Sequence, residues 1–517
     1  MSILNVENVS HGFGARKILE NVSFRMLKGE HIALVGANGE GKSTFLNIIT
    51  GKLAPDVGDV SWCNHITTGF LDQSSTLTKG KTIRETLHEA FENMYSLESE
   101  MLKKYEIMGD CEGEELDELM EDVGVIQDIL ETGGFYMLDS RIEEYANGLG
   151  LGDIGLDRDV SELSGGQRTK VLLTKLLLEN PMVLLLDEPT NYLDENHINW
   201  LTNFLQNYEN AFMLVSHDVN FLNKVVNIVY HVEDGILNRY KGDYTNFEQM
   251  YQLKKRQIEQ AYEKQQKEIE HLEKFIAKNK ARVATTNMAK SRQKKLDKME
   301  IIELAPTKMK PIFSFEYART PGRFLIDAQD IQIGYDEPLT KPMKLQLERG
   351  KKIAIKGVNG LGKSTLLKTL LKIIPSISGE IDLDPFVECA YFEQEANASN
   401  KTAMQTIWDL YPSLTNAQVR ASLAKCGLTT MHIESQMKVL SGGENAKVRL
   451  CALMMRASNL LVLDEPTNHL DVDAKDSLKT AIKNYKGTVL LVSHEPEFYE
   501  DIVTDVWNLE QWTNKII

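Results

Sequence analysis

The stretch "HIALVGANGEGKST" (residues 31–44) returns later in the chain as "KIAIKGVNGLGKST" (residues 352–365). Each copy begins with a short apolar run, which predicts a buried strand over 31–35 and over 352–356. The run is followed by the pattern G-x-x-x-x-G-K-S and a helical segment. Glycines in such a loop let backbone N–H groups surround phosphate oxygens, and the start of the helix adds positive potential. The repeat therefore predicts two phosphate-binding domains of the α/β class.

Three further motifs recur in the same order. "LSGGQ" (163–167) returns as "LSGGE" (440–444), "LLLDEPTNYLD" (184–194) as "LVLDEPTNHLD" (461–471), and "LVSHD" (214–218) as "LVSHE" (491–495). The motif aspartate and the motif histidine are 30 residues apart in both copies. This order and spacing indicate a duplicated domain, with each copy folded around its own core.

Acidic, hydroxyl and histidine residues of these motifs suit the hydrolysis of a nucleoside triphosphate. The strand-like runs end in aspartates that suit a Mg²⁺ ion held together with the loop serines. The next glutamate in each copy is a candidate to polarise the attacking water, and each histidine, expected to end an apolar strand, is a candidate to contact the γ-phosphate. The catalytic candidates are Glu188, Glu465, His217 and His494, and the Mg²⁺ candidates are Ser43, Gln73, Asp187, Ser364, Gln394 and Asp464. The candidate ATP-binding residues of the two phosphate loops are Gly36, Asn38, Gly39, Gly41, Lys42, Ser43 and Thr44, with Gly357, Asn359, Gly360, Gly362, Lys363, Ser364 and Thr365.

The composition is that of a globular protein with more than one domain. The chain has 517 residues, 42% hydrophobic content and a formal net charge of -17. No apolar stretch approaches the roughly 20 residues that cross a bilayer, and the start lacks a signal-peptide pattern, so a cytoplasmic protein is expected. We predict a first domain over 1–242, a linker over 243–321 and a second domain over 322–517.

The first copy carries an insert of about 44 residues. Lys42 and Asp187 are 145 residues apart, whereas Lys363 and Asp464 are 101 apart. The expected insert, 89–131, has fifteen acidic residues and only two lysines, with apolar residues such as Leu116, Leu119 and Met120 near helical spacing. It is predicted to form a helical, acidic arm, and a solvated hairpin without a partner is the alternative interpretation.

Residues 246–305 predict a helical hairpin between the domains. Apolar residues recur there with a period close to 3.5, at Tyr251, Ile258, Tyr262, Ile269, Leu272 and Ile276. "VATTN" (283–287) is expected to reverse the chain, and Met288 is expected to begin the apolar stripe of a returning helix. The tip, 278–299, holds eight cations and one aspartate, which favours an RNA backbone as its partner. The candidate RNA-binding residues are Lys278, Lys280, Arg282, Lys290, Arg292, Lys294, Lys295 and Lys298. A solvated spacer is the alternative.

Taken together, the motifs resemble those of ATP-binding-cassette (ABC) ATPases with two nucleotide-binding domains in one chain. The resemblance covers almost the whole sequence. It implies ATP and Mg²⁺ as cofactors, and it implies that each signature caps the ATP held by the opposite domain. The signature residues are Ser164, Gly165, Gly166 and Gln167 and, in the second copy, Ser441, Gly442, Gly443 and Glu444. Glu444 departs from the usual glutamine of the motif. Phe13 and Tyr335 match the family's adenine-stacking aromatic.

More narrowly, the chain resembles the ABC-F subgroup, which has a charged helical linker and no transmembrane part. That resemblance implies a ribosomal partner: the linker enters from the E site to reach tRNA and rRNA, and the arm contacts a ribosomal protein. It also implies a monomer whose two domains close on each other. The ATPase part of a membrane transporter and a DNA-repair ATPase are alternatives. Within the ribosomal interpretation, protection against antibiotics stays open, although the short linker turn favours a translation factor.

Overall fold

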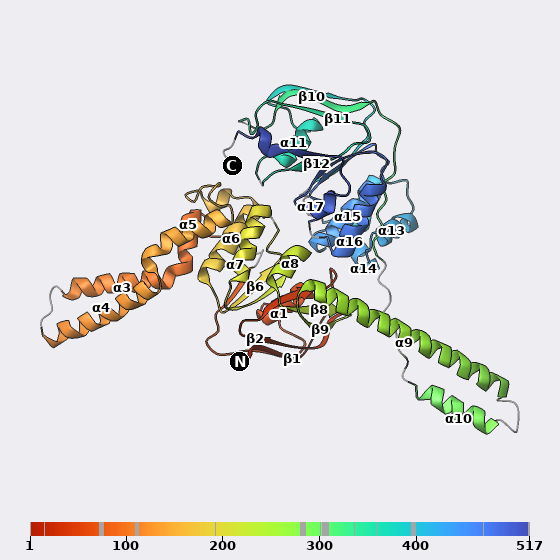
Figure 1. The fold of residues 1–517 in the computed structure, drawn as a ribbon, viewed down its shortest axis with the longest axis horizontal. Helices are drawn as coiled ribbons and strands as arrows, with labels where there is room; N and C mark the ends of the chain where they lie inside the picture. Colours follow the sequence, from red (N-terminus) through yellow and green to blue (C-terminus); the bar gives the residue numbers. More distant parts are fainter. Residues whose placement is uncertain are drawn as a thin grey trace.

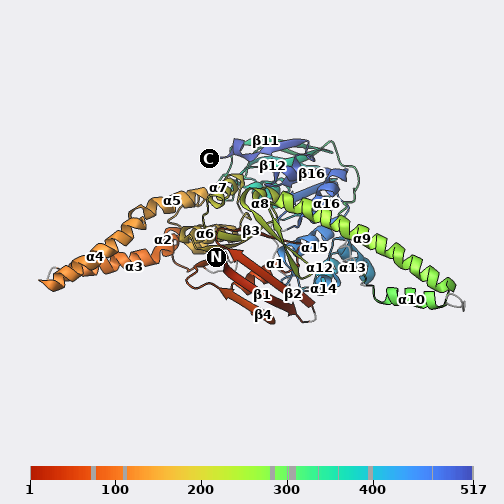
Figure 2. The same ribbon diagram turned by 60° about the horizontal axis from the view of Figure 1, so that its bottom comes forward.

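Two α/β cassettes lie against each other, and a helical hairpin projects from each side of them (Figures 1 and 2). This computed structural model describes residues 2–14, 16–71, 77–108, 113–191, 193–279, 286–299, 301, 310–335, 337–358, 360–393, 400–468 and 470–514. Within those ranges, no helix has the length and apolar character needed to cross a bilayer. We call the elements β1 to β9 the first cassette and β10 to β17 the second cassette, without the hairpins.

The main sheet of the first cassette is parallel except for its last strand. In spatial order its strands are β5 (Thr68–Leu71), β6 (Val183–Asp187), β7 (Ala211–Val215), β3 (His31–Val35), β8 (Ile228–Glu233) and β9 (Ile236–Lys241). Alternate residues of β6 enter two different core clusters: Val183 and Leu185 pack on one face, and Leu184 and Leu186 on the other. The strand reads as a continuous apolar run because both faces of the sheet are covered.

A smaller antiparallel sheet completes the core of the first cassette. Its strands, in spatial order, are β2 (Arg16–Leu27), β1 (Ser2–Phe13) and β4 (Val57–Trp62). Side chains of this sheet share one core cluster with α1 (Lys42–Ile49) and with one face of the main sheet. The phosphate loop, which leads into α1, is therefore held by two sheets.

The second cassette repeats this architecture. Its main sheet has β14 (Cys389–Phe392), β15 (Leu460–Asp464), β16 (Thr488–Val492), β12 (Lys352–Lys356) and β17 (Asp505–Asn508), all parallel. Its small sheet has β11 (Met343–Glu348), β10 (Phe324–Gln332) and β13 (Ser378–Leu383). The strands predicted over 31–35 and 352–356 are confirmed as β3 and β12.

The helices of the two cassettes flank these sheets. In the first cassette they include α2 (Ile83–His88), α5 (Leu138–Gly148), α6 (Gly165–Glu179), α7 (Glu195–Gln206) and α8 (Val219–Val225). In the second they include α11 (Lys363–Leu370), α12 (Ala403–Leu410), α13 (Asn416–Lys425), α14 (Thr430–Glu434), α15 (Gly442–Met454), α16 (Val472–Asn484) and α17 (Pro496–Tyr499).

The arm is a pair of helices, α3 (Glu92–Met108) and α4 (Glu114–Thr132), which run side by side away from the first cassette (Figure 1). The predicted helical insert is thus confirmed. Its small core consists of Met101, Val123, Ile126 and Leu130. Met120, which the sequence places in the apolar pattern, is 55% exposed, because the two helices bury only one narrow stripe.

The linker is also a hairpin, but its two helices differ in length. The long helix is α9 (Tyr244–Asn279), and the short one is α10 (Thr286–Asp297). Lys295 pairs with Glu268 at 2.6 Å, and the guanidinium of Arg292 lies 4.2 Å from the ring centroid of Phe275. These contacts place α10 along the distal end of α9 only.

Three expectations for the linker are wrong in detail. α10 begins at Thr286, inside the turn expected over 283–287, so Asn287 is helical. Met288, expected in an apolar stripe, is 55% exposed. Ile258, expected to face a companion helix, is also exposed, because α10 does not reach that part of α9.

Candidate functional site

The phosphate-binding lysines close the loops in which they stand. Nζ of Lys42 donates to the carbonyl oxygens of Gly36 at 2.7 Å and Ala37 at 3.1 Å. Nζ of Lys363 donates in the same way to Gly357 at 2.8 Å and Val358 at 3.2 Å. Both loops therefore wrap around a lysine ammonium, which places a positive charge within the loop that would receive a phosphate.

A glycine precedes each of these lysines because the chain turns there into a left-handed conformation. Gly41 and Gly362 have φ values of 103° and 92° and stand at the N-caps of α1 and α11. A Cβ on Gly41 would lie 2.6 Å from a methyl group of Ile18. The motif glycine thus serves both the turn and the close approach of β2.

The motif aspartates end β6 and β15 beside the loop serines. Oγ of Ser43 donates to Oδ2 of Asp187 at 3.2 Å. Burial raises the pKa of Asp187, and it raises the pKa of Asp464 to about 6, against a hydrogen bond from Ser364 that lowers it. Oδ1 of Asp464 is buried and has no hydrogen-bond partner among the described residues. A buried, unpartnered carboxylate oxygen beside a serine hydroxyl fits a hydrated Mg²⁺.

The two catalytic glutamates, which directly follow these aspartates in the chain, share an unusual backbone conformation. Glu188 and Glu465 have φ values of 50° and 48°. The backbone N–H of each donates to the last residue of the neighbouring strand, Val215 at 2.9 Å and Val492 at 3.0 Å respectively. Non-glycine residues held in the left-handed region cost of order 1–3 kcal/mol and cluster at functional sites. The fold therefore fixes both carboxylates at the carboxyl edge of the sheet.

The motif histidines face these glutamates, but with different geometry. Nε2 of His217 lies 3.4 Å from Oε1 of Glu188. Nε2 of His494 lies 2.9 Å from Oε1 of Glu465 and 3.0 Å from Nζ of Lys363. β7 and β16 end two residues before the histidines, so the expectation that each histidine ends a strand is wrong by two residues. The extra residues carry the imidazoles beyond the sheet edge.

The signatures begin α6 and α15 through reciprocal caps. The hydroxyl of Ser164 accepts from the N–H of Gln167, and the side chain of Gln167 accepts from the N–H of Ser164. Ser441 and Glu444 form the same capping box. Since Glu and Gln both close such a box, the departure at Glu444 keeps the local structure. The first helical residue of each signature, Gly165 or Gly442, is exposed.

Each phosphate-loop lysine lies within electrostatic range of a carboxylate from the other cassette. Burial lowers the pKa of Lys42, while nearby carboxylates, including Asp471 of the second cassette, oppose that shift. Burial lowers the pKa of Lys363 to about 8, and Asp194 of the first cassette is among the carboxylates that oppose it. The side-chain amide of Asn220 donates to Glu497 at 2.5 Å across the same interface.

Asp194 and Asp471 were not assigned a role from the sequence. Each caps a helix, α7 or α16, by accepting from the N–H three residues on. Asp471 is also 2.7 Å from Nζ of Lys447 on α15. The repeated aspartate directly ahead of a helical pattern was the available signal, because it marks an N-cap. Its proximity to the opposite lysine depends on tertiary structure.

The two candidate adenine-stacking aromatics are open to solvent. Phe13 is 58% exposed at the end of β1, and Tyr335 is 70% exposed after β10. Exposed rings are available for stacking.

Five of the candidate residues lie outside the described residues: Gln73, Asn359, Lys280, Arg282 and Gln394.

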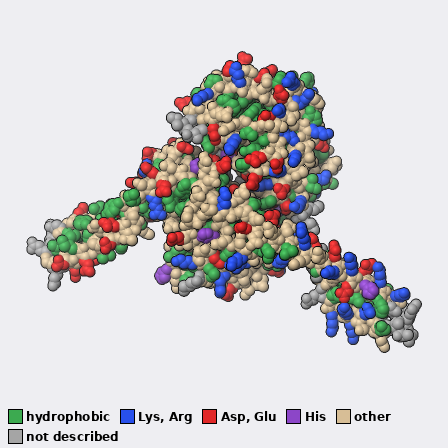
Figure 3. All heavy atoms as spheres, viewed as in Figure 1, with side chains coloured by type: hydrophobic (Ala, Val, Ile, Leu, Met, Phe, Trp, Pro, Cys, Tyr) green, Lys and Arg blue, Asp and Glu red, His purple; other side chains and the backbone are tan. Residues whose placement is uncertain are grey.

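The described cations of the linker tip divide into two groups. Arg292 and Lys295 contact α9, as given above. The side chains of Lys278, Lys290, Lys294 and Lys298 are exposed. Figure 3 shows Lys and Arg side chains on the hairpin at the lower right, interspersed with acidic ones.

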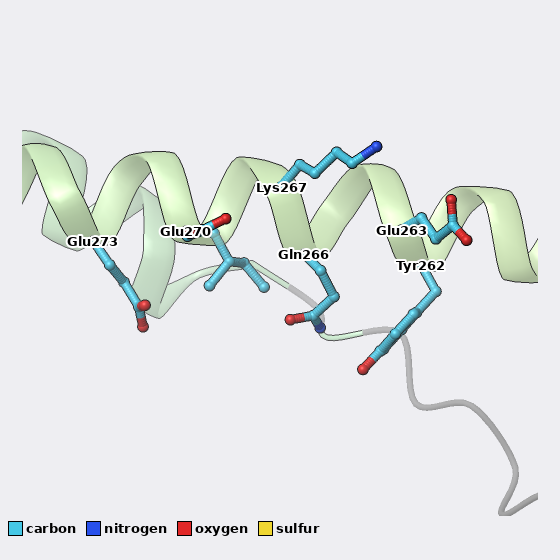
Figure 4. Close-up of a pocket in the computed structure, with 7 residues that line it drawn as sticks. Tyr262, Glu263, Gln266, Lys267, Glu270 and Glu273 are labelled. Carbon is cyan, nitrogen blue, oxygen red and sulfur yellow. The ribbon is translucent and has the colours of Figure 1, made fainter.

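A pocket of about 450 Å³ lies along α9, away from the phosphate loops. Figure 4 shows Tyr262, Gln266 and Glu273 pointing to one side of the helix, while Lys267 points to the other. The lining is mainly charged and lies on a single helix. It therefore does not compete with the loops as a nucleotide site.

Comparison with known proteins identifies the family. A family profile described as "ABC transporter" matches residues 19–191 and 340–468, and a second profile with that description matches residues 230–315, which contain α9 and α10. The chain is 59% identical to the uncharacterized ABC transporter ATP-binding protein YfmM of Bacillus subtilis (strain 168), over 100% of both chains. It is 34% identical to ABC transporter F family member 2 of Arabidopsis thaliana, over 97% of this chain and 75% of that protein.

A solved structure shares the fold. The archaeal ribosome recycling factor aABCE1, in complex with the archaeal ribosomal stalk protein aP1, matches with a TM-score of 0.56 at 20% identity, over 97% of this chain and 87% of that chain. At this identity the likeness shows the tandem fold alone. The two matched ABC ATPase domains imply ATP binding and hydrolysis. The chain belongs to the ABC-F family, with two ABC cassettes and the helical linker of that family between them.

Proposed function

We propose that this ABC-F protein is an ATP-driven clamp that binds the ribosome at the E site and touches tRNA and rRNA with its linker. The observation that carries the proposal is the group of exposed lysines along α10 and at the end of α9, in a chain whose net charge is -17. A local group of lysines on an otherwise acidic protein favours one local contact with a polyanion over binding by the whole surface.

Two composite ATP sites would drive the clamp. The first pairs the loop of Lys42 with the signature that begins at Ser441, and the second pairs the loop of Lys363 with the signature that begins at Ser164. The action of Asp471 on Lys42, and of Asp194 on Lys363, supports this exchange between the halves. An ATP between the cassettes would favour the closed state by its contacts to both.

Within each site the residues would divide the work of phosphoryl transfer. Ser43 with Asp187, and Ser364 with Asp464, would hold Mg²⁺, which neutralises charge that builds up on the phosphate oxygens. Gln73 and Gln394 are proposed as further ligands. Glu188 and Glu465 would accept a proton from the attacking water, and His217 and His494 would hold the γ-phosphate.

The base of the linker is tied to both cassettes, which couples their closure to the direction of the hairpin. The hydroxyl of Tyr251 on α9 donates to Glu233 of β8 at 2.5 Å. At the exit, Nζ of Lys310 lies 2.6 Å from Asp473 on α16. One end therefore follows the first cassette and the other follows the second, so that a change in their spacing changes the angle of the hairpin.

The tip is proposed to contact the RNA backbone rather than to stack on bases. Residues 278–299 contain no aromatic side chain, and stacking is what sequence-tolerant recognition of single-stranded bases requires. Phosphate contacts through lysines would make ribosome affinity fall as salt rises.

The arm is proposed to meet a ribosomal protein. It is acidic, and it also exposes Leu102, Tyr105, Val125 and Ile129. Apolar side chains ringed by acidic ones suit a basic protein surface. Among ribosomal roles we favour a translation factor over drug protection, because only six residues, 280–285, separate α9 from α10.

Sedimentation with ribosomes tests the proposal. The variant with Glu188→Gln and Glu465→Gln should pellet with 70S-type particles in the presence of ATP, and it should remain in the supernatant without nucleotide. Adding Lys290→Glu, Lys294→Glu and Lys298→Glu should reduce pelleting and should lower the slope of log affinity against log salt by about two to three.

The matched control reverses three cations near the cassette end of α9, Lys254, Lys255 and Arg256, all of which are exposed. Both triple variants have the same net charge. Equal losses from the two sets would contradict a specific role of the tip, and a supernatant location under all conditions would contradict ribosome binding altogether.

A further inference from the structure

The second signature has Glu444 where the first has Gln167. The carboxylate of Glu444 pairs with His432. Oε2 of Glu444 accepts from the backbone N–H of Ser441 at 2.9 Å. Its other oxygen, Oε1, lies 3.2 Å from Nε2 of His432. The two side chains are only 12% and 13% exposed, so this pair is shielded from water at the foot of α15.

The orientation of His432 is fixed from its other side. His432 is the third residue of α14 and completes a capping box with Thr429. The N–H of Thr429 donates to Nδ1 of the imidazole at 3.4 Å. With Nδ1 as acceptor, the neutral ring carries its hydrogen on Nε2 and donates it to Glu444. One line of contacts thus runs from the cap of α14 through His432 and Glu444 to the cap of α15.

The first cassette has neither member of this pair. In the first cassette, Gln167 stands in place of Glu444 and caps back to the signature serine. The residue twelve positions before Gln167 is Gly155, whereas the residue twelve positions before Glu444 is His432. Oε1 of Gln167 accepts from the N–H of Ser164 at 2.9 Å, so the capping box itself is the same. Carboxylate and histidine occur together in one cassette and are absent together from the other.

We propose that His432 is a positioning residue for the nucleotide cap of the second cassette. This inference rests on the proposed function, in which the start of α15 faces the terminal phosphate held by Lys42. A carboxylate beside that phosphate repels it and competes for the same helical N–H groups. The hydrogen bond from His432 keeps Glu444 turned back onto Ser441, and the first N–H groups of α15 stay available to the phosphate.

Steady-state kinetics of the full chain test this role. The Glu465→Gln variant leaves turnover to the site of Lys42 and serves as the background. In that background His432→Ala should raise KM for ATP about tenfold, the low end of what losing one hydrogen bond to a charged group costs, with a smaller effect on kcat. Glu444→Gln alone, in the same background, supplies the reference KM for the double variant below.

The decisive variant combines His432→Ala with Glu444→Gln. An amide closes the capping box without a charge, so KM should equal that of Glu444→Gln alone. A merely structural loss at His432 would not be rescued in this way. If His432→Ala leaves KM unchanged, or if the double variant keeps the raised KM, the inference is wrong.

Ser441→Ala separates failure of this inference from failure of the proposed composite site. A raised KM in that variant, together with an unchanged KM in His432→Ala, overturns only the role of His432. An unchanged KM in Ser441→Ala overturns the composite site and the inference with it.

Discussion

The two catalytic centres carry the same motifs but different side-chain networks. Burial, with Asp187 next to it, raises the pKa of Glu188 to about 8. Burial also acts to raise the pKa of Glu465, but the hydrogen bond and charge of His494, together with Lys363, bring it below its ordinary value. The difference follows the geometry, because the imidazole is 3.4 Å away in the first centre and 2.9 Å away in the second. Identical sequence motifs therefore do not ensure identical proton affinity.

The largest expected effect comes from removing the two carboxylates. The variant with both Glu188→Gln and Glu465→Gln should lose at least about 100-fold in kcat, the usual contribution of a general base. At pH 7, Glu465→Gln alone should lose more turnover than Glu188→Gln alone, because Glu465 is ionised and Glu188 is mostly protonated. Phosphate release at saturating ATP measures this, and a larger loss in Glu188→Gln would contradict the comparison.

A middle-sized effect on turnover is expected from replacing Lys475. This residue belongs to the second cassette, and its charge lowers the pKa of Glu188 in the first cassette. Lys475 stands four residues after the capping Asp471, and the residue at that place in the first cassette is Ile198. Lys475→Ile, measured in the Glu465→Gln background at pH 7, should lower turnover by up to about tenfold, which one unit of pKa would give.

Lys479→Ile is the control for that change. Lys479 lies one turn further along α16 and pairs with Asp501 at 3.2 Å. Its replacement should leave turnover nearly unchanged. Equal losses in the two variants would indicate damage to α16 rather than a charge acting on Glu188.

The smallest effect concerns stability without nucleotide. A folded-state pKa of about 8, against an ordinary value of 4.5, means that Glu188 stabilises the folded state at low pH and that this contribution is lost as pH rises toward 8. The midpoint of thermal unfolding should therefore fall less between pH 6 and pH 8 in Glu188→Gln than in the wild type.

Glu465→Gln is the control for this change, because the pKa of Glu465 is shifted in the opposite direction. The pKa of Glu465 is lowered, so its contribution is fully present above the ordinary value and is lost only in acid. Its removal should leave the slope between pH 6 and pH 8 as in the wild type. A flattened slope in this variant would show that the two glutamates do not differ as described.

Local patterns explain why much of the fold was predictable. The strand before each phosphate loop, the glycine ahead of Lys42 and the helical arm were all visible in short stretches of sequence. The linker was less predictable, because an apolar period along α9 indicates a partner but not its length. α10 contacts α9 near Glu268 through Lys295 but ends before it reaches the level of Ile258, so Ile258 lies exposed.

The sequence by itself determined two nucleotide-binding cassettes, an inserted arm and a basic linker tip, since repeated motifs, their spacing and local composition indicate each of them. Only the tertiary structure decided how the cassettes differ. The distance from His217 to Glu188, the reach of Lys475 across the interface and the pairing of His432 with Glu444 join residues on different elements. Burial and neighbouring charges set proton affinity and hydrogen bonding, and no motif spacing records them.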